Sequence, residues 1–379
     1  MDGDDEETVN SRVISVRRIG VDDEEAVRAL AQRAFFPLGS LSFPRAPDAL
    51  IAERGGELLG SVVLRTFELP GSGRDEDCRG GVMLWLMVDP EARRLGVGGR
   101  LVEAALRSFE ERGCQEVFAC VEGYNSSSAN LFAARGFTIL SFGEQLRRYG
   151  FLGTLWLWLK TSRLGADMGQ FLWARPGQLK ADEPALQWWT GVFASALVLL
   201  LAGWRSGWPG EFDPTIILGA VVIVVALYGL REGAMRLAAR LQGLSVRHRA
   251  WESAFPLSIA IALAAGVFFP IPGSIYPRQG TWRYRDLLPK LGLMAFAGAS
   301  AVLIFAWAAW ALAQLGEPSS EAAVGLLAAH TASLILAAFD MLLPFSLFCS
   351  FDGRRVWDWN RPAWGALAVA VLGLFFTGL

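Results

Sequence analysis

Uncharged apolar segments fill much of the second half of this 379-residue chain. Of its 72 Lys, Arg, Asp and Glu residues, 49 precede Pro184 and only 23 lie beyond that point. Segment 215–230 alone has ten Ile, Leu and Val residues, each of which favours insertion into a bilayer by roughly 0.3–0.6 kcal/mol. The chain is therefore predicted to join a water-soluble domain to an all-α polytopic membrane domain in a lipid bilayer.

The apolar runs also predict how the chain crosses the membrane. They are residues 188–204, 215–230, 255–269, 291–315, 322–348 and 362–379. Five arginines between 231 and 249 favour a cytosolic loop by the positive-inside rule, but a full crossing by 255–269 would place the basic loop 278–290 outside. We therefore expect five full spans, with 255–272 re-entrant or interfacial. Six spans remain the alternative, and in both cases the N-terminal domain faces the cytosol.

Charge and cysteine usage narrow the function classes. A net charge of -2 gives no basic footprint, so no nucleic-acid partner is expected. The four cysteines show no C-x-x-C spacing, which indicates neither a zinc site nor a disulfide framework, and no metal is expected. Residues 1–11 form an acidic tail that lacks the features of a signal or transit peptide.

The first half alternates predicted strands and helices. We expect a strand at 12–18, a helix from Val21, and a hairpin of 49–53 with 58–69 around Gly55-Gly56. A strand at 81–88 and a helix at 98–112 follow, and then strands at 115–121 and 152–160. This pattern predicts an α+β domain.

The most informative segment runs from Val88 to Leu101, where a strand passes through a glycine-rich turn into a helix. Glycines allow backbone amides to approach a ligand closely, and a helix N-terminus attracts anions. Arg93 and Arg94 add positive charge. The turn therefore predicts a site for an anion such as a diphosphate, although such a turn can also serve packing alone.

Two motifs in this half resemble those of the GNAT superfamily of N-acetyltransferases. The first, R-x-x-G-x-G/A after a V-x-P strand end, is met by Val88, Pro90, Arg93, Gly96 and Gly98. The second is the helix that begins near Asn125 and ends at Gly136-Phe137. The resemblance covers residues 12–160 and implies an α/β/α fold with a mixed, mostly antiparallel sheet. A linker at 161–187 and the membrane domain at 188–379 would follow.

The resemblance implies acetyl-CoA as co-substrate and an amine as acceptor. The sequence leaves open which amine this is and whether it is membrane-associated. The cofactor's pyrophosphate would be held by the loop, and its pantetheine and acetyl group by the edge of the preceding strand. The cofactor-binding residues so implied are Leu86, Val88, Arg93, Arg94, Gly96, Val97, Gly98, Gly99, Asn125 and Phe132.

One position departs from the family pattern. Many relatives carry a tyrosine that protonates the coenzyme thiolate, whereas this chain has Phe132, which has no proton to give. Tyr124 could act as the acid instead, with Glu122 as the base; otherwise Tyr124 packs at the strand end and Glu122 is a solvated surface acid. Phe132 also motivates an alternative function, an acyl-CoA-sensing domain that regulates the membrane domain.

The membrane half resembles intramembrane site-2 metalloproteases more weakly. Arg231-Glu232-Gly233-Ala234-Met235 stands where that family has H-E-x-x-H, and segments 339–344 and 351–353 resemble its second motif. Both zinc-binding histidines are replaced, by Arg231 and Met235, and only Asp352 would survive. The resemblance thus implies a pseudoprotease without metal.

The remaining polar residues of this half have simpler expected roles. Glu232 is expected to pair with Arg236 one helical turn on. His248 is expected on a basic cytosolic face, and His330 between helices. Asp340 either lines a polar pocket or makes a helix–helix hydrogen bond.

Overall fold

The computed structural model describes residues 13–34, 48–69, 78–161, 168–177, 183–207, 214–278, 281–315, 317, 320–344 and 350–377. The chain divides into two compact units. Unit 1 comprises Met1–Val121, Ser128–Thr161 and Phe171–Lys180, and unit 2 comprises Glu122–Ser127, Ser162–Gln170 and Ala181–Leu379. The predicted acidic tail, residues 1–11, lies outside the described residues.

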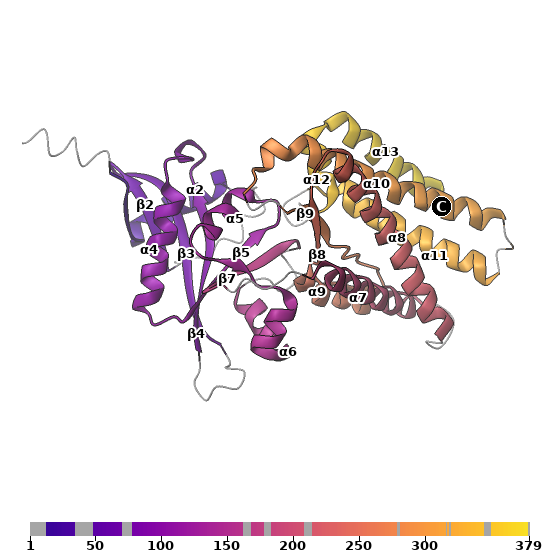
Figure 1. Ribbon diagram of the computed structural model, residues 1–379, viewed down its shortest axis with the longest axis horizontal. Helices are drawn as coiled ribbons and strands as arrows, with labels where there is room; N and C mark the ends of the chain where they lie inside the picture. Colours follow the sequence, from indigo (N-terminus) through magenta and orange to yellow (C-terminus); the bar gives the residue numbers. More distant parts are fainter. Residues whose placement is uncertain are drawn as a thin grey trace, which may run out of the picture. The chain divides into compact units, whose positions relative to one another are not determined.

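A seven-stranded sheet forms the centre of the N-terminal fold (Figure 1). Its strands are β1 (Ser15–Arg18), β2 (Ala49–Arg54), β3 (Glu57–Leu69), β4 (Cys78–Val88), β5 (Glu116–Glu122), β6 (Thr138–Ile139) and β7 (Gln170–Arg175), in the spatial order β1-β2-β3-β4-β5-β7-β6. Strands β1 to β4 pair antiparallel, β4 and β5 pair parallel, and β6 and β7 pair antiparallel. The predicted hairpin is confirmed, since Gly55 and Gly56 at its turn both have positive φ.

Helices cover both faces of this sheet. On one face, α4 (Val97–Glu111) and α5 (Ser126–Ala133) share a core with Val62 and Met83. On the other face, α2 (Glu24–Ala34) packs near Val63, and α6 (Phe142–Lys160) packs near Val82. Neighbouring strand residues thus point to opposite layers, as strand geometry requires. The three layers and the mixed sheet confirm the predicted fold class.

One predicted strand is wrong. Residues 152–160 belong to α6, in which the φ of 66° at Gly150 interrupts the helical backbone. The buried side chains Thr154, Leu157 and Trp158 recur at a spacing of three to four, which is helical, although threonine and tryptophan are residue types that favour strands. The sheet is completed instead by β7, which lies within the predicted linker 161–187.

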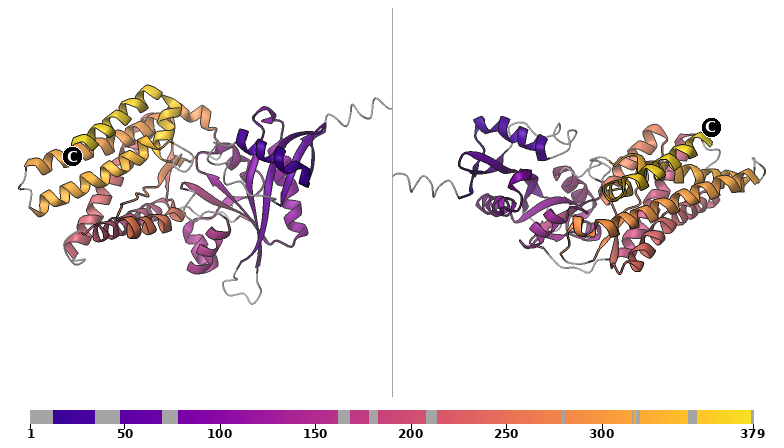
Figure 2. Two further views of the ribbon diagram at one scale, coloured as in Figure 1. Left: turned by 180° about the vertical axis from the view of Figure 1, so that it is seen from behind. Right: turned by 90° about the horizontal axis from the view of Figure 1, so that it is seen from above.

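Unit 2 is mainly helical. It contains α7 (Pro184–Arg205), α8 (Pro214–Leu241), α9 (Phe255–Ala265), α10 (Tyr284–Leu315), α11 (Glu321–Leu342), α12 (Asp352–Trp359) and α13 (Arg361–Thr377). Helix α10 packs against α8, α11 and α12, and Figure 2 shows the long helices side by side. A small antiparallel sheet of β8 (Val246–Arg249) and β9 (Ser274–Pro277) was not predicted.

Four helices of the described part of the chain are long and apolar enough to cross a membrane: α7, α8, α10 and α11. They correspond to four of the five predicted spans. The fifth, α13, has 17 residues, and α9, the segment predicted not to cross, has 11. How many of these helices cross a membrane stays a prediction.

Two residues assigned to the basic cytosolic loop are buried instead. Arg231 is 2% exposed because α8 continues as far as Leu241 and carries its side chain into the unit. His248 is 1% exposed on β8, where its Nδ1 atom lies 2.9 Å from Glu232 Oε2. The positive-inside rule counts lysines and arginines without regard to the ion pairs that they make inside a fold.

Other predictions for unit 2 are confirmed. Glu232 pairs with Arg236, with 2.7 Å between Oε1 and Nη2. His330 lies between helices, since its Nδ1 atom is 3.0 Å from the carbonyl oxygen of Ala306 on α10.

Candidate functional site

The turn between β4 and α4 has the backbone of an anion-binding loop. Asp89 caps a short 3-10 turn at Pro90–Ala92 by accepting a hydrogen bond from the amide of Glu91. Arg94 and Gly96 then take left-handed conformations, with φ of 70° and 81°, and α4 begins at Val97. The chain thus reverses within a few residues and directs the start of α4 back toward the end of β4.

The N-terminus of α4 has no side-chain cap. The first amides of an α-helix have no partner within the helix, so those of Val97, Gly98 and Gly99 are available to a ligand. Gly96 is exposed, and a Cβ placed on it would meet no atom within 4 Å. The space beside Gly96 is therefore open, and the N-terminus of α4 that follows it carries the positive end of the helix dipole.

Charged residues reinforce this loop. Arg93 and Arg94 are exposed beside it. Asp89 anchors its base, where it accepts the Glu91 amide and pairs with Arg33 at 2.8 Å. That amide first, and then Arg33, lower the pKa of Asp89, so this carboxylate stays ionised and holds the turn. The geometry suits the binding of a phosphate or diphosphate group.

The strand before the loop is irregular. Trp85 has a φ of 50°, and the register with β3 shifts between Ser61 and Val63, which marks a bulge. The pairing of β4 with β5 runs from Gly80 opposite Glu116 to Met83 opposite Ala119, while β4 continues to Val88. Leu86 and Val88, both predicted to bind cofactor, thus lie beyond this pairing and are partly buried.

Phe132 and Asn125 belong to the second motif. Phe132 is 3% exposed, lies in the core beneath α4 and packs edge-on against Phe137 at 5.1 Å between ring centroids. Asn125 precedes α5, and its amide donates to the carbonyl oxygen of Glu122 at 2.9 Å. The Phe132 ring thus fills the core, and a role for it in binding cofactor stays a prediction.

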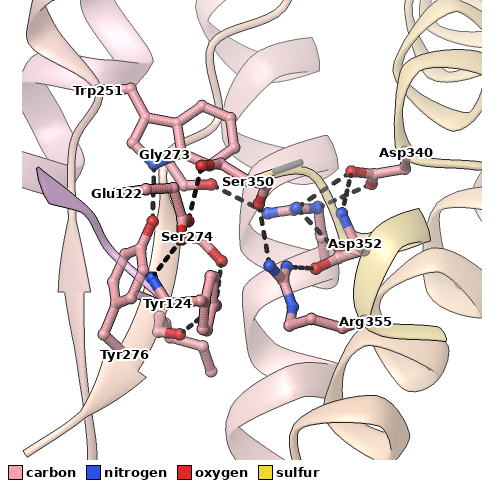
Figure 3. A network of polar contacts seen from close by, with 12 residues as sticks. Glu122, Tyr124, Trp251, Gly273, Ser274, Tyr276, Asp340, Ser350, Asp352 and Arg355 are labelled. Carbon is pink, nitrogen blue, oxygen red and sulfur yellow. Dashed lines mark hydrogen bonds and ion pairs between the residues drawn. The ribbon is translucent and has the colours of Figure 1, made fainter. Parts of the chain in front are cut away.

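Glu122 and Tyr124, the predicted base and acid, lie in a polar network of unit 2 (Figure 3). Glu122 accepts hydrogen bonds from Ser350 Oγ at 3.1 Å and from the amide of Tyr124 at 2.9 Å. The Tyr124 hydroxyl donates to the carbonyl oxygen of Ile275 at 2.8 Å. Glu122 is partly buried and is therefore not a solvated surface acid, whereas Tyr124 is 5% exposed and packs at the end of the strand.

Burial changes the acidity of both groups. It raises the pKa of the Glu122 carboxyl above its usual 4.5, which the Tyr124 amide and Ser350 partly oppose. It also raises the pKa of the Tyr124 phenol above 10, an effect that the Arg355 charge partly opposes. Glu122 is therefore a stronger base than an exposed glutamate, and Tyr124 stays protonated at neutral pH.

The structure groups the predicted site residues in two sets. The loop residues 93–99 and the strand residues Leu86 and Val88 belong to unit 1, whereas Glu122, Tyr124 and Asn125 belong to unit 2. The network around the second set includes Ser350 and Arg355, which sequence reasoning missed. A usable signal was the charged segment 352–358 between apolar runs, because buried charges in such surroundings need partners.

A second buried cluster joins three helices of unit 2. Arg231 pairs with Asp340, with 3.0 Å between Nε and Oδ2, and with Asp352, with 2.9 Å between Nη2 and Oδ2. Asp340 thus makes a helix-to-helix interaction rather than lining a pocket on its own. Within the described residues, no group of three His, Cys, Asp or Glu side chains could hold a metal ion.

The sequence matches known acetyltransferases over the region that contains both motifs. Residues 18–137 match the model of the acetyltransferase (GNAT) family. A mycothiol acetyltransferase of Amycolatopsis mediterranei (strain U-32) is 32% identical over 114 residues, which are 30% of this chain and 35% of that protein. One of Sanguibacter keddieii is 33% identical over 99 residues, 26% of this chain and 30% of that protein. The chain thus spans about a third of the length of these relatives.

Solved structures also align with this chain. An N-acetylglutamate synthase from Neisseria gonorrhoeae, complexed with coenzyme A and N-acetyl-glutamate, has 21% identity and a TM-score of 0.31 over 43% of this chain and 35% of its own. The ribosomal-protein-S18-alanine N-acetyltransferase from Escherichia coli has 16% identity and a TM-score of 0.31 over 45% of this chain and 98% of its own. The family match and the loop geometry together support a GNAT-type fold for residues 18–137.

Proposed function

We propose that this chain is a membrane-anchored N-acetyltransferase that transfers an acetyl group from acetyl-CoA to the amine of an acceptor. The observation that carries this proposal is the uncapped N-terminus of α4, which follows the left-handed Gly96 inside a domain that matches the GNAT family. An anion-binding helix start is what a coenzyme with a diphosphate requires.

The loop residues supply binding. The amides of Val97, Gly98 and Gly99 would hold the diphosphate, with Arg93 and Arg94 adding positive charge. Leu86 and Val88, at the part of β4 beyond its pairing with β5, would align the pantetheine. Acetyl-CoA supplies an acetyl group that is activated as a thioester.

Proton transfer is the proposed role of Glu122 and Tyr124. Glu122 would accept the proton of the acceptor amine, since its raised pKa brings it nearer to neutral pH. Tyr124 would donate a proton to the departing thiolate, because its phenol remains protonated. The role of Tyr124 needs a local rearrangement of its hydroxyl, which donates to the carbonyl oxygen of Ile275 in this structure.

Membrane anchoring is the proposed role of the four long helices. Their outer faces expose large apolar side chains, among them Phe193, Val222 and Ile304, which are 57%, 57% and 68% exposed. Such faces suit lipid. We further propose that the acetyltransferase domain lies in the cytosol, where acetyl-CoA is available.

The C-terminal unit is proposed not to cleave peptides. If it derives from a site-2-protease-like scaffold, Arg231 and Met235 stand at the positions of the metal-binding histidines. Arg231 is committed to Asp340 and Asp352, and Met235 is 1% exposed. These residues offer neither nitrogen nor oxygen ligands for a catalytic zinc.

A second candidate, an acyl-CoA sensor, is favoured by one observation. Phe132 replaces a hydroxyl-bearing residue and is buried against Phe137. In this alternative the domain binds acetyl-CoA without turnover, and binding biases the C-terminal unit.

Thiol release tests the two candidates. The purified full chain is incubated with acetyl-CoA and a panel of amines that includes the acceptor of mycothiol acetyltransferases, the relatives named above, and free CoA is measured. We expect CoA release with at least one amine, and at least tenfold less from an Arg93→Ala, Gly96→Asp variant. Arg107→Ala, an exposed arginine further along α4, is the matched control and should keep full activity. Tight acetyl-CoA binding without release from any amine would favour the sensor.

A further inference from the structure

Arg355 occupies the centre of the network that contains Glu122 and Tyr124 (Figure 3). It lies on α12 and is 1% exposed. Its Nη1 donates to the carbonyl oxygen of Ser350 at 3.0 Å, and its Nη2 donates to Asp352 Oδ1. A buried guanidinium with two such bonds has a fixed position and plane.

This guanidinium reaches both proposed proton-transfer residues. Its Cζ atom lies 4.1 Å from the centroid of the Tyr124 ring, which is cation–π distance. Ser350, whose carbonyl oxygen accepts from Arg355, donates its own hydroxyl to Glu122 Oε1 at 3.1 Å. Arg355 therefore fixes the Tyr124 phenol by stacking on its ring, and it fixes the Glu122 carboxylate through Ser350.

The aromatic residues around position 355 suit an arginine better than a lysine. Three of the five tyrosines of the chain gather here, since the Tyr276 and Tyr284 rings lie 4.6 and 6.4 Å from the Tyr124 ring. Tyr276 is held in turn by the indole of Trp251 at 3.0 Å. A lysine could keep the charge at position 355 but could not stack as a plane or donate in a fork.

Arg355 is also tied to the long helices. Asp352, its ion-pair partner, is shared with Arg231 of α8, and Arg231 pairs with Asp340 of α11. The position of Arg355 therefore depends on the packing of α8, α11 and α12.

We propose that Arg355 is a positioning residue for acetyl transfer: it holds Glu122 and Tyr124 at the end of β5, so that turnover depends on the packing of the C-terminal unit. This inference rests on the proposed function. It gives the C-terminal unit a role in the reaction that a membrane anchor alone does not need.

Two substitutions separate positioning from charge. Arg355→Lys removes the stack and the fork but keeps the charge. We expect kcat to fall on the order of 10- to 100-fold, as misplacement of reacting groups does, with KM for acetyl-CoA unchanged. Arg354→Lys is the matched control, because the neighbouring Arg354 is half exposed and pairs with Asp358, and we expect its kcat to stay within about twofold of the original.

Arg355→Gln also removes the charge. In the part of the chain that the structure describes, the groups that act on the Glu122 carboxyl include Ser350, the amides of Tyr124 and Asn125, Tyr276, Tyr284 and Arg355, and of these only Arg355 is a cation. Because that charge lowers the Glu122 pKa, its loss raises the pKa. The acidic limb of the pH profile of kcat should therefore move to higher pH in Arg355→Gln and stay in place in Arg355→Lys. An unchanged kcat in both variants would overturn the inference.

Hydrogen exchange provides a readout that does not depend on turnover. In the full-length protein, amides of residues 116–127 should exchange at least tenfold faster in Arg355→Lys than in Arg354→Lys, while amides of α4 stay unchanged. Equal exchange in the two variants would refute the positioning role even if no amine is acetylated. Absence of transfer in the unsubstituted protein, with faster exchange in Arg355→Lys, would instead refute the proposed function and leave Arg355 as an ordering residue.

Discussion

Substitution of Gly96 by alanine tests whether the left-handed turn before α4 binds acetyl-CoA. Gly96 has a φ of 81°, and a Cβ there would meet no atom within 4 Å, so the substitution adds strain without a clash. A left-handed conformation costs a non-glycine residue about 1–2 kcal/mol. This strain either remains in the folded loop or is relieved by a change in its conformation.

The two responses have different consequences. If the loop keeps its conformation, the protein loses about 1–2 kcal/mol of stability and binds acetyl-CoA as before. If the loop relaxes, acetyl-CoA must restore the turn, and Kd rises about 5- to 30-fold, since 1.4 kcal/mol corresponds to a factor of ten. We expect the second outcome, because the loop lies at the surface and its amides at the start of α4 have no cap to hold them.

Gly113 provides the matched control. It follows the other end of α4, has a φ of 71°, and also has no atom within 4 Å of an added Cβ. Gly113→Ala therefore introduces the same strain away from the predicted cofactor loop. Calorimetric titration of the full-length protein with acetyl-CoA should give a weaker Kd for Gly96→Ala alone. Equal Kd values for the two variants would refute the assignment of the loop.

Three further predictions concern other parts of the chain. Arg231→Met leaves the buried Asp340 without its cation and removes one of the two cations that pair with Asp352, so it should destabilise unit 2 by about 3–5 kcal/mol in denaturant titrations. Arg236→Met, at a side chain that is 44% exposed, should cost less than about 1 kcal/mol. Hydrogen bonds from Arg147 and Arg148 lower the pKa of Glu144 from 4.5 to about 2. The ionised Glu144 therefore contributes its full stabilisation of unit 1 above pH 4.5 and loses it as the pH falls through about 2. In Glu144→Gln, the free energy of unfolding should depend less on pH over this range, as followed by tryptophan fluorescence during acid unfolding. Val222→Arg on the exposed face of α8 should disfavour membrane insertion by about 2.5–3.5 kcal/mol, visible as increased extraction by alkaline carbonate; unchanged extraction would argue that α8 does not face lipid.

The sequence predicts the parts of this fold that depend on local signals. The hairpin at Gly55-Gly56, the strand that leads into the loop and the helix after Gly96 follow from glycine conformation and hydrophobic period. Residues 152–160 mislead because threonine and tryptophan favour strands, while only the burial of side chains on the sheet reveals their helical spacing. Strand β7 lies in the sheet between β5 and β6, both of which precede it in the sequence. Its place in the sheet therefore depends on tertiary contacts and not on a local pattern.

The sequence predicts the loop and two members of the network, Glu122 and Tyr124, but not the residues that surround these two. Arg93 to Gly99 form a contiguous motif whose backbone chemistry can be inferred from residue types alone. Arg355 contacts Tyr124 across more than two hundred residues of sequence, so its role depends on tertiary packing. The same holds for Arg231, which looks like a loop cation until Asp340 and Asp352 are placed beside it.

The interleaving of the two units determines what a shortened protein would lack. A fragment ending at residue 160, the predicted domain boundary, loses β7, which lies between β5 and β6 in the sheet. It loses Leu172 and Ala174, which are buried in the core beside α6, and the carbonyl oxygen of Leu172 that accepts from the amide of Leu140.

A fragment ending at residue 180 restores that strand but leaves 122–127 without Ser350 and Arg355. We therefore expect the first fragment to be insoluble, and the second to fold as a sheet with rapid amide exchange at 122–127. If the first fragment instead shows the cooperative unfolding of an intact domain, β7 is dispensable and the predicted linker begins where the sequence places it.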